Sequence, residues 1–190
     1  MNLVIKKLSK DMLDNYLHFF DDIAFCDNPT WSWCYCNHYH LLDKEIEVIK
    51  SKDESRTCLI KRINDEKHNG FMAFIDNEPV GWINTDKKEN YARLMNDPQI
   101  AYDTDKTIAS IVCFIVAKDY RGKGIATRLL NEAYTYYEKE GYDLVEAYPM
   151  SAPKNQAENY HGPLGMYMSN GFEILKDLDH IKIVTKQVNK

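Results

Sequence analysis

Hydrophobic residues change their spacing several times along this chain, and each spacing predicts a different element. Residues 3–6 are predicted to form a strand, and beyond Ser9, a candidate N-cap, the apolar positions recur at the helical period. The charged stretch 43–69 is predicted to contain one amphipathic helix that ends at Gly70. The first third of the chain is therefore expected to supply one strand and two helices.

The middle of the chain carries the strongest strand signals. Two short apolar runs, 71–75 and 79–84, flank turn-forming residues, which predicts a hairpin. Residues 107–117 form a β-branched, apolar run that is typical of a strand buried on both faces. We expect this run to be the central strand of the sheet.

Helix and strand signals alternate in the last third. Residues 124–140 have helical spacing and end before Gly141, and residues 142–148 then form a strand that ends at Pro149. The tail is predicted to contain a short helix and two strands, at 164–170, 172–175 and 181–188. This order predicts a mixed sheet with crossover helices, an α/β (α+β) fold.

Composition restricts the function more than the fold. A chain of 190 residues, 44% of them hydrophobic, can bury the core of one domain, which we expect to span residues 1–190. The net charge of -5 argues against a nucleic-acid partner, which needs clustered Lys and Arg, and favours a small-molecule partner. The first residues do not resemble a secretory signal, no apolar run approaches membrane-spanning length, and the five cysteines form an odd set. We therefore expect a cytoplasmic protein with reduced thiols and no membrane partner.

The junction between the predicted central strand and the next helix carries the clearest chemical signal. Residues 116–127 pass from a buried strand through Gly122 and Gly124 into a helix N-terminus. Free N–H groups and the positive end of the helix dipole favour an anion there, and Arg121 and Lys123 add positive charge. A pyrophosphate fits such a loop; the alternative is a glycine-containing turn with two surface cations.

Two common nucleotide-binding motifs fail at this loop because of residue positions. A Walker P-loop needs Ser or Thr after its lysine, whereas Lys123 is followed by Gly124. A dinucleotide-binding fingerprint needs a third glycine where Thr127 stands. The loop therefore belongs to another class of anion site.

Arg121, Gly124 and Ala126 match the Arg/Gln-x-x-Gly-x-Gly/Ala signature of the GNAT superfamily of N-acetyltransferases, and the chain resembles that family. The resemblance implies a mixed, mostly antiparallel sheet flanked by helices, with a splayed pair of central strands. It also implies acetyl-CoA as the acyl donor, with its pyrophosphate at the loop and its pantetheine arm along the central strand. The implied cofactor-binding residues are Phe114, Ile115, Val116, Arg121, Gly122, Lys123, Gly124, Ile125, Ala126 and Thr127.

A second motif downstream resembles the same family. Tyr167 stands four residues before Gly171-Phe172, where the family places a tyrosine near the coenzyme sulfur. We therefore take Tyr167 as the candidate acid that protonates the leaving thiolate, with simple aromatic packing as the alternative. A backbone N–H near Val116 would stabilise the tetrahedral intermediate. The family often has an asparagine where this chain has Tyr160, so one cofactor contact is not carried over.

The general base has two candidates. Glu146 is a carboxylate inside the apolar strand 142–148, where burial would raise its pKa; the alternative is a residue on a solvated edge. His161, just before the tyrosine helix, has an intrinsic pKa near neutrality. The sequence does not choose between them.

An aromatic and cysteine-rich stretch occupies residues 31–40. On a strand its two cysteines and two histidines would share one face, yet this spacing is poor for tetrahedral zinc, so we expect no metal. Related proteins of the GNAT family use this region to wall the acceptor pocket, which implies a substrate-binding role, with core packing as the alternative. The four candidate substrate-binding residues are Trp31, Trp33, Tyr35 and His38.

Four short motifs over most of the chain resemble one bacterial branch of the superfamily; they are Trp-x-x-Cys-x-Cys, Gly81-Trp82, Tyr91-Ala92-Arg93-Leu94 and His161-Gly162. The resemblance implies an N-acetyltransferase that transfers an acetyl group from acetyl-CoA to an amine by direct attack. A catalytically silent acyl-CoA-binding sensor is the alternative. The sequence does not identify the amine acceptor, and it leaves a homodimer open.

Overall fold

A single sheet organises the chain, of which the computed structural model describes residues 2–102, 104–155 and 157–188. Within these ranges seven strands pair in the order β1-β2-β3-β4-β5-β7-β6. The β4–β5 pair is parallel and the other five pairs are antiparallel, which confirms the mixed, mostly antiparallel sheet. The strands are β1 (Leu3–Lys7), β2 (Gly70–Ile75), β3 (Glu78–Lys87), β4 (Ile108–Val116), β5 (Leu144–Ala147), β6 (Glu173–Asp177) and β7 (Lys182–Gln187).

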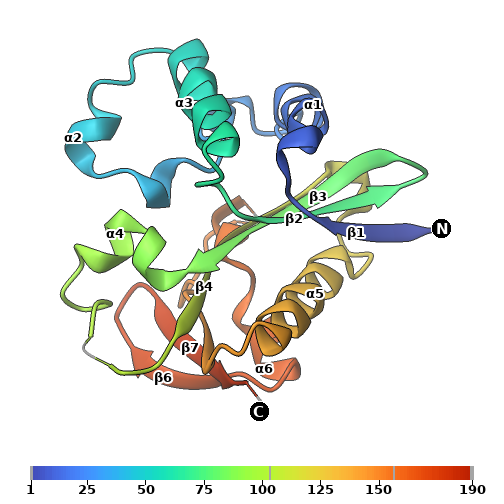
Figure 1. Ribbon diagram of the computed structural model, residues 1–190. Helices are drawn as coiled ribbons and strands as arrows, with labels where there is room; N and C mark the ends of the chain where they lie inside the picture. Colours follow the sequence, from blue (N-terminus) through green and yellow to red (C-terminus); the bar gives the residue numbers. More distant parts are fainter. Residues whose placement is uncertain (1, 103, 156, 189–190) are drawn as a thin grey trace.

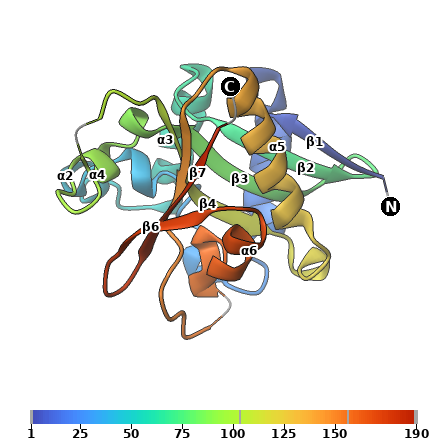
Figure 2. The same cartoon turned by 90° about the horizontal axis from the view of Figure 1, so that it is seen from below.

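Helices cover both faces of the sheet (Figure 1). The α-helices are α1 (Leu13–His18), α2 (Asp43–Ile46), α3 (Lys52–Asn64), α4 (Ala92–Met95), α5 (Ile125–Lys139) and α6 (Leu164–Ser169). The first three lie on one face, and α5 and α6 lie on the other, where α5 packs across β2, β3 and β4 (Figures 1 and 2). This arrangement is the predicted α+β fold.

The two faces of β2 illustrate why its sequence lacks polar positions. Met72 and Phe74 belong to the core beneath α1 and α3, whereas Phe71, Ala73 and Ile75 belong to the core beneath α5. Because both faces are covered, every residue of the strand is buried. A strand covered on both faces favours apolar residues at every position, so hydrophobic and polar residues do not alternate along it.

The segment before β2 differs from the prediction. The stretch 43–69 holds two helices, α2 and α3, and the second begins where the Glu54 backbone N–H donates to the Ser51 hydroxyl at 3.1 Å. Gly70 does not end a helix but opens β2. A Cβ at this position would lie 2.1 Å from the Ile83 carbonyl oxygen, so this glycine permits a close approach of two strands.

The aromatic and cysteine-rich stretch is neither a strand nor an α-helix. Two 3-10 helices, Pro29–Trp31 and His38–His40, flank a series of turns. Within the turns Tyr35 and Cys36 have positive φ angles, 42° and 54°. Such angles are uncommon for residues other than glycine and indicate that the surrounding packing holds the backbone. The stretch therefore offers neither a single strand face nor an α-helical turn to its cysteines and histidines.

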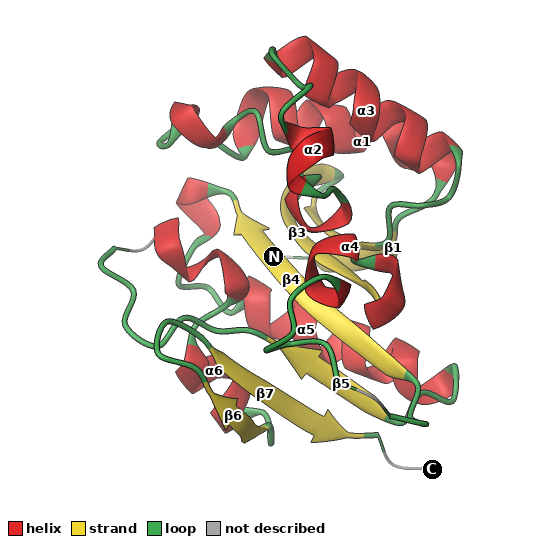
Figure 3. Cartoon of the chain, turned by 90° about the vertical axis from the view of Figure 1, so that its left-hand side faces the viewer, coloured by secondary structure: helices red, strands yellow, loops and turns green. Residues whose placement is uncertain are grey.

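The centre of the sheet is split at one end. β4 pairs with β5 only from Ile108 to Ile111, whereas its pairing with β3 continues to Val116. In Figure 3 the arrow of β4 diverges from β5, β7 and β6. The last residues of β4 therefore keep one edge whose N–H and C=O groups β5 does not pair. This confirms the expected splayed pair of central strands.

Candidate active site

A cavity of about 820 Å³ lies between the unpaired end of β4 and the start of α5. Nine of the ten predicted cofactor-binding residues line it; they are Phe114, Ile115, Val116, Arg121, Gly122, Gly124, Ile125, Ala126 and Thr127. Lys123 is not in the lining, and its Nζ lies 5.1 Å from the ring centroid of Tyr120. The structure thus gathers strand, loop and helix N-terminus around one hollow.

The backbone of the loop turns at two glycines. Gly122 and Gly124 have φ angles of 73° and 79°, and Gly124 is the N-cap of α5. The first N–H groups of a helix have no partner within it, so those of residues 125–127 are free to bind an anion beside the cavity. A ligand with a pyrophosphate group would find backbone donors here, whatever the side chains contribute.

Arg121 is held by groups close to the loop. Its Nε donates to the Val116 carbonyl at 3.0 Å, and its two terminal nitrogens bind the Asp27 carboxylate at 2.5 and 3.0 Å. This hydrogen bond to Arg121 lowers the pKa of Asp27. The guanidinium therefore ties the loop to β4, while Asp27 offsets much of its charge. Because the two partners are 94 positions apart, no local sequence pattern revealed Asp27.

A second cavity, of about 520 Å³, adjoins the first. Four residues line both cavities and so mark their junction; they are Phe25, Trp31, Ile115 and Tyr160. Of the predicted substrate-binding residues, Trp31, Trp33 and His38 line the second cavity. The end of β4 therefore lies between the first cavity, beside the loop, and the second cavity, which is largely apolar.

Tyr35, the fourth predicted substrate-binding residue, lies outside the lining of both cavities. It is completely buried, and its hydroxyl donates to Asp21, whose carboxylate also accepts a hydrogen bond from Arg56 at 3.0 Å. These contacts fix the loop against α3 and the segment after α1. These contacts agree with the packing alternative for Tyr35, and its substrate-binding role stays a prediction.

Tyr167, the predicted acid, is buried on α6 below β4. Its hydroxyl donates to the backbone carbonyl of His161 at 2.6 Å, and burial raises its pKa well above the ordinary range. Gly162 lies against it, since a Cβ there would be 3.0 Å from the hydroxyl oxygen. The hydroxyl thus anchors the segment that carries His161, and its acid role stays a prediction.

His161 reaches the second cavity through a neighbour. Its Nε2 lies 2.8 Å from the hydroxyl of Tyr39, which lines that cavity and also interacts with the Tyr160 hydroxyl. Burial lowers the pKa of His161 to about 4, although the Val112 backbone acts in the opposite direction. The imidazole is therefore neutral at neutral pH and able to accept a proton. Sequence reasoning found His161 but missed Tyr39, whose only signal was its place in the aromatic stretch.

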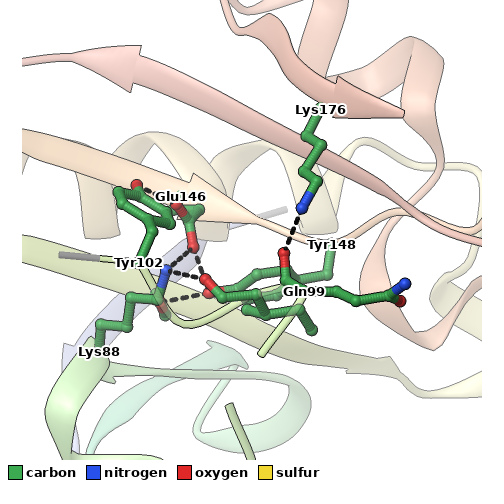
Figure 4. A network of polar contacts seen from close by, with 8 residues as sticks. Lys88, Gln99, Tyr102, Glu146, Tyr148 and Lys176 are labelled. Carbon is green, nitrogen blue, oxygen red and sulfur yellow. Dashed lines mark hydrogen bonds and ion pairs between the residues drawn. The ribbon is translucent and has the colours of Figure 1, made fainter. Parts of the chain in front are cut away.

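Glu146, the other candidate base, lies in a buried polar network (Figure 4). It accepts hydrogen bonds from Lys88 Nζ at 2.7 Å, from Tyr102 at 2.6 Å and from Tyr148 at 2.6 Å. It is completely buried and lines neither cavity, so the solvated-edge alternative is wrong. Its contacts favour a structural ion pair, and its role as a base stays a prediction.

No group of three or more His, Cys, Asp and Glu side chains in the described ranges is arranged to hold a metal ion. None of the helices that the structure describes combines the length and apolar character needed to cross a bilayer.

Comparison with known proteins identifies the family. The sequence profile of the Acetyltransferase (GNAT) family matches residues 30–166, which is most of the chain, and the chain belongs to this family. No curated protein matches the chain by sequence. No branch of the family is singled out.

Solved structures share the fold at low sequence identity. The PaiA N-acetyltransferase of Thermoplasma acidophilum, in complex with coenzyme A, is 20% identical with a TM-score of 0.58, over 98% of this chain and 99% of that one. An N-acetyltransferase from Staphylococcus aureus Mu50 is 16% identical, with a TM-score of 0.59 over the full length of both chains. The ribosomal-protein-S18-alanine N-acetyltransferase of Escherichia coli is 14% identical, with a TM-score of 0.54 over 100% of this chain and 96% of that one. At these identities the likeness concerns the fold alone.

Proposed function

We propose that this protein is an N-acetyltransferase that transfers an acetyl group from acetyl-CoA to an amine by direct attack. The observation that carries the proposal is the meeting of two cavities at the unpaired end of β4, at Ile115. The first cavity offers helix N-terminal amides for a pyrophosphate, and the second offers an apolar space for an acceptor. Direct attack needs the two substrates side by side, which adjoining cavities allow.

The donor would be held by the backbone more than by charge. The loop amides at the start of α5 bind the pyrophosphate, and the backbone of Phe114, Ile115 and Val116, which β5 does not pair, binds the pantetheine arm. Arg121 keeps the loop and β4 together through Val116. A backbone N–H near Val116 would stabilise the negative oxygen of the tetrahedral intermediate, as fixed donors do in acyl transfer.

Proton removal from the acceptor would pass through Tyr39. A protonated amine has a pKa of about 10.4 if it resembles lysine, so it must lose a proton before it attacks. Tyr39 lines the acceptor cavity, and its hydroxyl is bonded to the neutral imidazole of His161 at 2.8 Å. The pair offers a hydroxyl that accepts the amine proton as it passes its own to His161. Tyr167 remains our proposed acid for the leaving thiolate, with Glu146 as the second candidate base.

The chemistry of the second cavity restricts the acceptor. Its described lining contains aromatic, aliphatic, sulfur and neutral polar side chains but no carboxylate. A polyamine would need anionic partners for its remaining charges, whereas one amine on an apolar or aromatic body would not. We therefore propose an acceptor of the second kind, such as an arylalkylamine or an amino group next to an aromatic side chain.

One observation favours the catalytically silent alternative. The Tyr167 hydroxyl already donates to the His161 carbonyl. If this hydrogen bond never breaks, the hydroxyl cannot protonate the leaving thiolate, and the protein binds acyl-CoA without turnover. Release of free thiol from acetyl-CoA, measured across a panel of amines, tests both functions. We expect phenylethylamine to stimulate release more than spermidine. Slow hydrolysis that no amine stimulates would instead support an acyl-CoA-binding module.

The remaining expectations stay proposals. We propose one catalytic domain over residues 1–190 in the cytoplasm, without nucleic-acid or membrane partners. A homodimer stays open, and size-exclusion chromatography with light scattering would determine the oligomeric state.

A further inference from the structure

Aromatic side chains gather in the wall of the second cavity. Six of them line it; they are Phe25, Trp31, Trp33, His38, Tyr39 and Tyr160. The first five come from the segment after α1, whereas Tyr160 belongs to the 3-10 helix Ala157–His161 near the other end of the chain. Tertiary packing therefore assembles this wall from two distant segments.

The rings of the two segments touch in a continuous series. The ring of Trp31 lies 5.6 Å from that of Tyr160, between centroids, at an angle of 75°. Tyr160 lies 4.2 Å from His161, which in turn lies 5.4 Å from Tyr39 at 67°. Rings that meet at such steep angles form corners rather than one flat surface. A small group in such a corner contacts more than one ring.

The wall carries no formal charge. The described lining of the second cavity contains no Asp, Glu, Lys or Arg. Burial, followed by the nearby Arg93, lowers the pKa of His38, and burial lowers that of His161 to about 4, so both imidazoles are neutral at pH 7. Arg93 itself lies outside the lining and pairs with the Asp43 carboxylate at 2.7 Å.

An ammonium ion in this cavity would thus meet neither a carboxylate that neutralises it nor an unpaired cation that repels it. The attraction that remains is that of the aromatic rings, whose faces carry negative electrostatic potential. Indole attracts cations most strongly of the three aromatic ring types. Trp31 is the indole at the junction of the two cavities, where the acetyl group of the donor would end.

We propose that the second cavity binds the acceptor as an ammonium cation through the rings around Trp31, and that it also binds quaternary ammonium ions. The inference rests on the proposed function, because it concerns the form in which the acceptor amine arrives. The ring series places the ammonium near the Tyr39 hydroxyl, which then takes its proton. A quaternary ammonium has the same charge but no N–H, so it binds without reacting.

Quaternary ammonium ions are the sharper probe of this site for a physical reason. Their charge is spread over alkyl groups and is weakly hydrated, so little hydration is lost on entry into an apolar cavity. A desolvated cation–π contact then lowers the Kd by roughly thirtyfold. A neutral molecule of the same shape gains the apolar contact alone.

Choline and 3,3-dimethylbutan-1-ol form such a pair, since they differ in a quaternary nitrogen replaced by carbon. Isothermal titration calorimetry of the full-length protein with each compound measures the effect of charge directly. We expect the Kd of choline to be lower by about tenfold or more. Equal Kd values, or no binding of choline at millimolar concentrations, would overturn the proposal.

Three variants place the effect at Trp31. This side chain is 37% exposed, so Trp31→Leu should fold, and it should weaken choline binding by about tenfold and that of the neutral alcohol by no more than about twofold. Trp31→Phe keeps a ring and should retain most of the preference for choline. Tyr134→Leu is the matched control, because Tyr134 lies on α5 outside the described lining of both cavities, and it should change neither Kd. Equal losses for the two ligands in Trp31→Leu would reduce Trp31 to apolar packing and contradict the ammonium site.

Activity measurements separate this inference from the proposed function. Choline should inhibit acetylation of phenylethylamine competitively and leave the Kd of coenzyme A unchanged. If choline binds as expected but no amine stimulates release of thiol, the proposed function fails and the ammonium site stands. If phenylethylamine is acetylated and choline neither binds nor inhibits, the ammonium site fails and the proposed function stands.

Discussion

Buried polar side chains in this protein act mainly by fixing backbone segments. The Tyr167 hydroxyl binds the His161 carbonyl, and the Arg121 guanidinium binds the Val116 carbonyl. The motifs predict that both residues act near the cofactor. In the structure each of them also holds a backbone segment of the site in place. Substitutions at such positions therefore change structure and chemistry together, and a test must separate the two.

Tyr167→Phe separates them for the proposed acid. The ring that packs is kept, and loss of the hydrogen bond to His161 should lower the stability by about 1 kcal/mol. If the hydroxyl protonates the leaving thiolate, kcat should fall by about 10²- to 10⁴-fold while the affinity for coenzyme A stays the same. Steady-state rates with an accepted amine, together with thermal unfolding, measure both effects. Wild-type turnover in the variant would leave Tyr167 with its anchoring role alone.

His161 makes stability depend on pH. Its folded pKa of about 4 lies below the ordinary value of 6.5, so between these values the unfolded chain binds more protons than the folded one. Stability should then fall as the pH drops below about 6.5. His161→Gln removes this contribution, so its loss of unfolding free energy from pH 7 to pH 5 should be smaller by about 2 kcal/mol. Urea denaturation at both pH values checks this; equal losses in the two proteins would contradict it.

The function we propose depends most on two ends of secondary structure that meet at the first cavity. Beyond Ile111, β4 supplies an edge that β5 does not pair, and α5 supplies free amides behind Gly124. Neither property belongs to a single side chain. Both follow from where a strand pair separates and where a helix begins.

Gly124→Val tests the helix terminus. A β-branched residue is strained at a φ of 79°, and because no atom lies within 4 Å of the added Cβ, the strain falls on the loop backbone rather than on neighbours. In the wild type, coenzyme A at one hundred times its Kd should add about 2.7 kcal/mol of stability, seen as a higher Tm. The variant should lose that shift.

The matched control for this test lies at the other end of the same helix. Gly141 has a φ of 75° and equally free surroundings, so Gly141→Val carries similar strain away from the cavity. It should lower the Tm and keep the coenzyme A shift. A folded Gly124→Val protein with an unchanged shift would remove the loop from the proposed binding site.

Lys88 and Glu146 connect the strand β5 to the segment after β3 through a buried ion pair. Removing one charge leaves the other buried without compensation, so Lys88→Met should cost about 3–5 kcal/mol of stability. The double variant Lys88→Met/Glu146→Gln should be the more stable of the two, because the uncompensated charge is gone. Denaturant titration of both proteins measures the difference. A double variant less stable than Lys88→Met would contradict this account of the network.

On the scale of the whole molecule, two adjoining cavities meet at the end of β4, beyond the part of the strand that pairs with β5. The helices on one face wall the apolar cavity, and α5 with its loop walls the other. The chain matches the GNAT family model and shares its fold with solved acetyltransferases. The function we propose therefore depends on a gap in the sheet as much as on any motif.

The sequence by itself determined the features that arise from neighbours along the chain. Strand and helix periods predicted most elements to within a few residues, and the spacing of Arg121, Gly124 and Ala126 predicted the loop that lines the first cavity. These predictions succeed because hydrophobic period, glycine conformation and helix capping act over short stretches. The conformation of the segment 31–40 could not be predicted from its sequence, because contacts with distant elements hold its turns.

Only the tertiary structure decided which side chains meet. It brought Asp27 to Arg121, Lys88 to Glu146, and Cys36 to Cys113. It also showed that Tyr35 and Tyr39, four positions apart in one aromatic stretch, face different surroundings. Such pairings depend on how the chain packs at long range, and single-sequence patterns do not encode that packing. The polar environment of each candidate residue, and hence its pKa, is therefore a property of the fold.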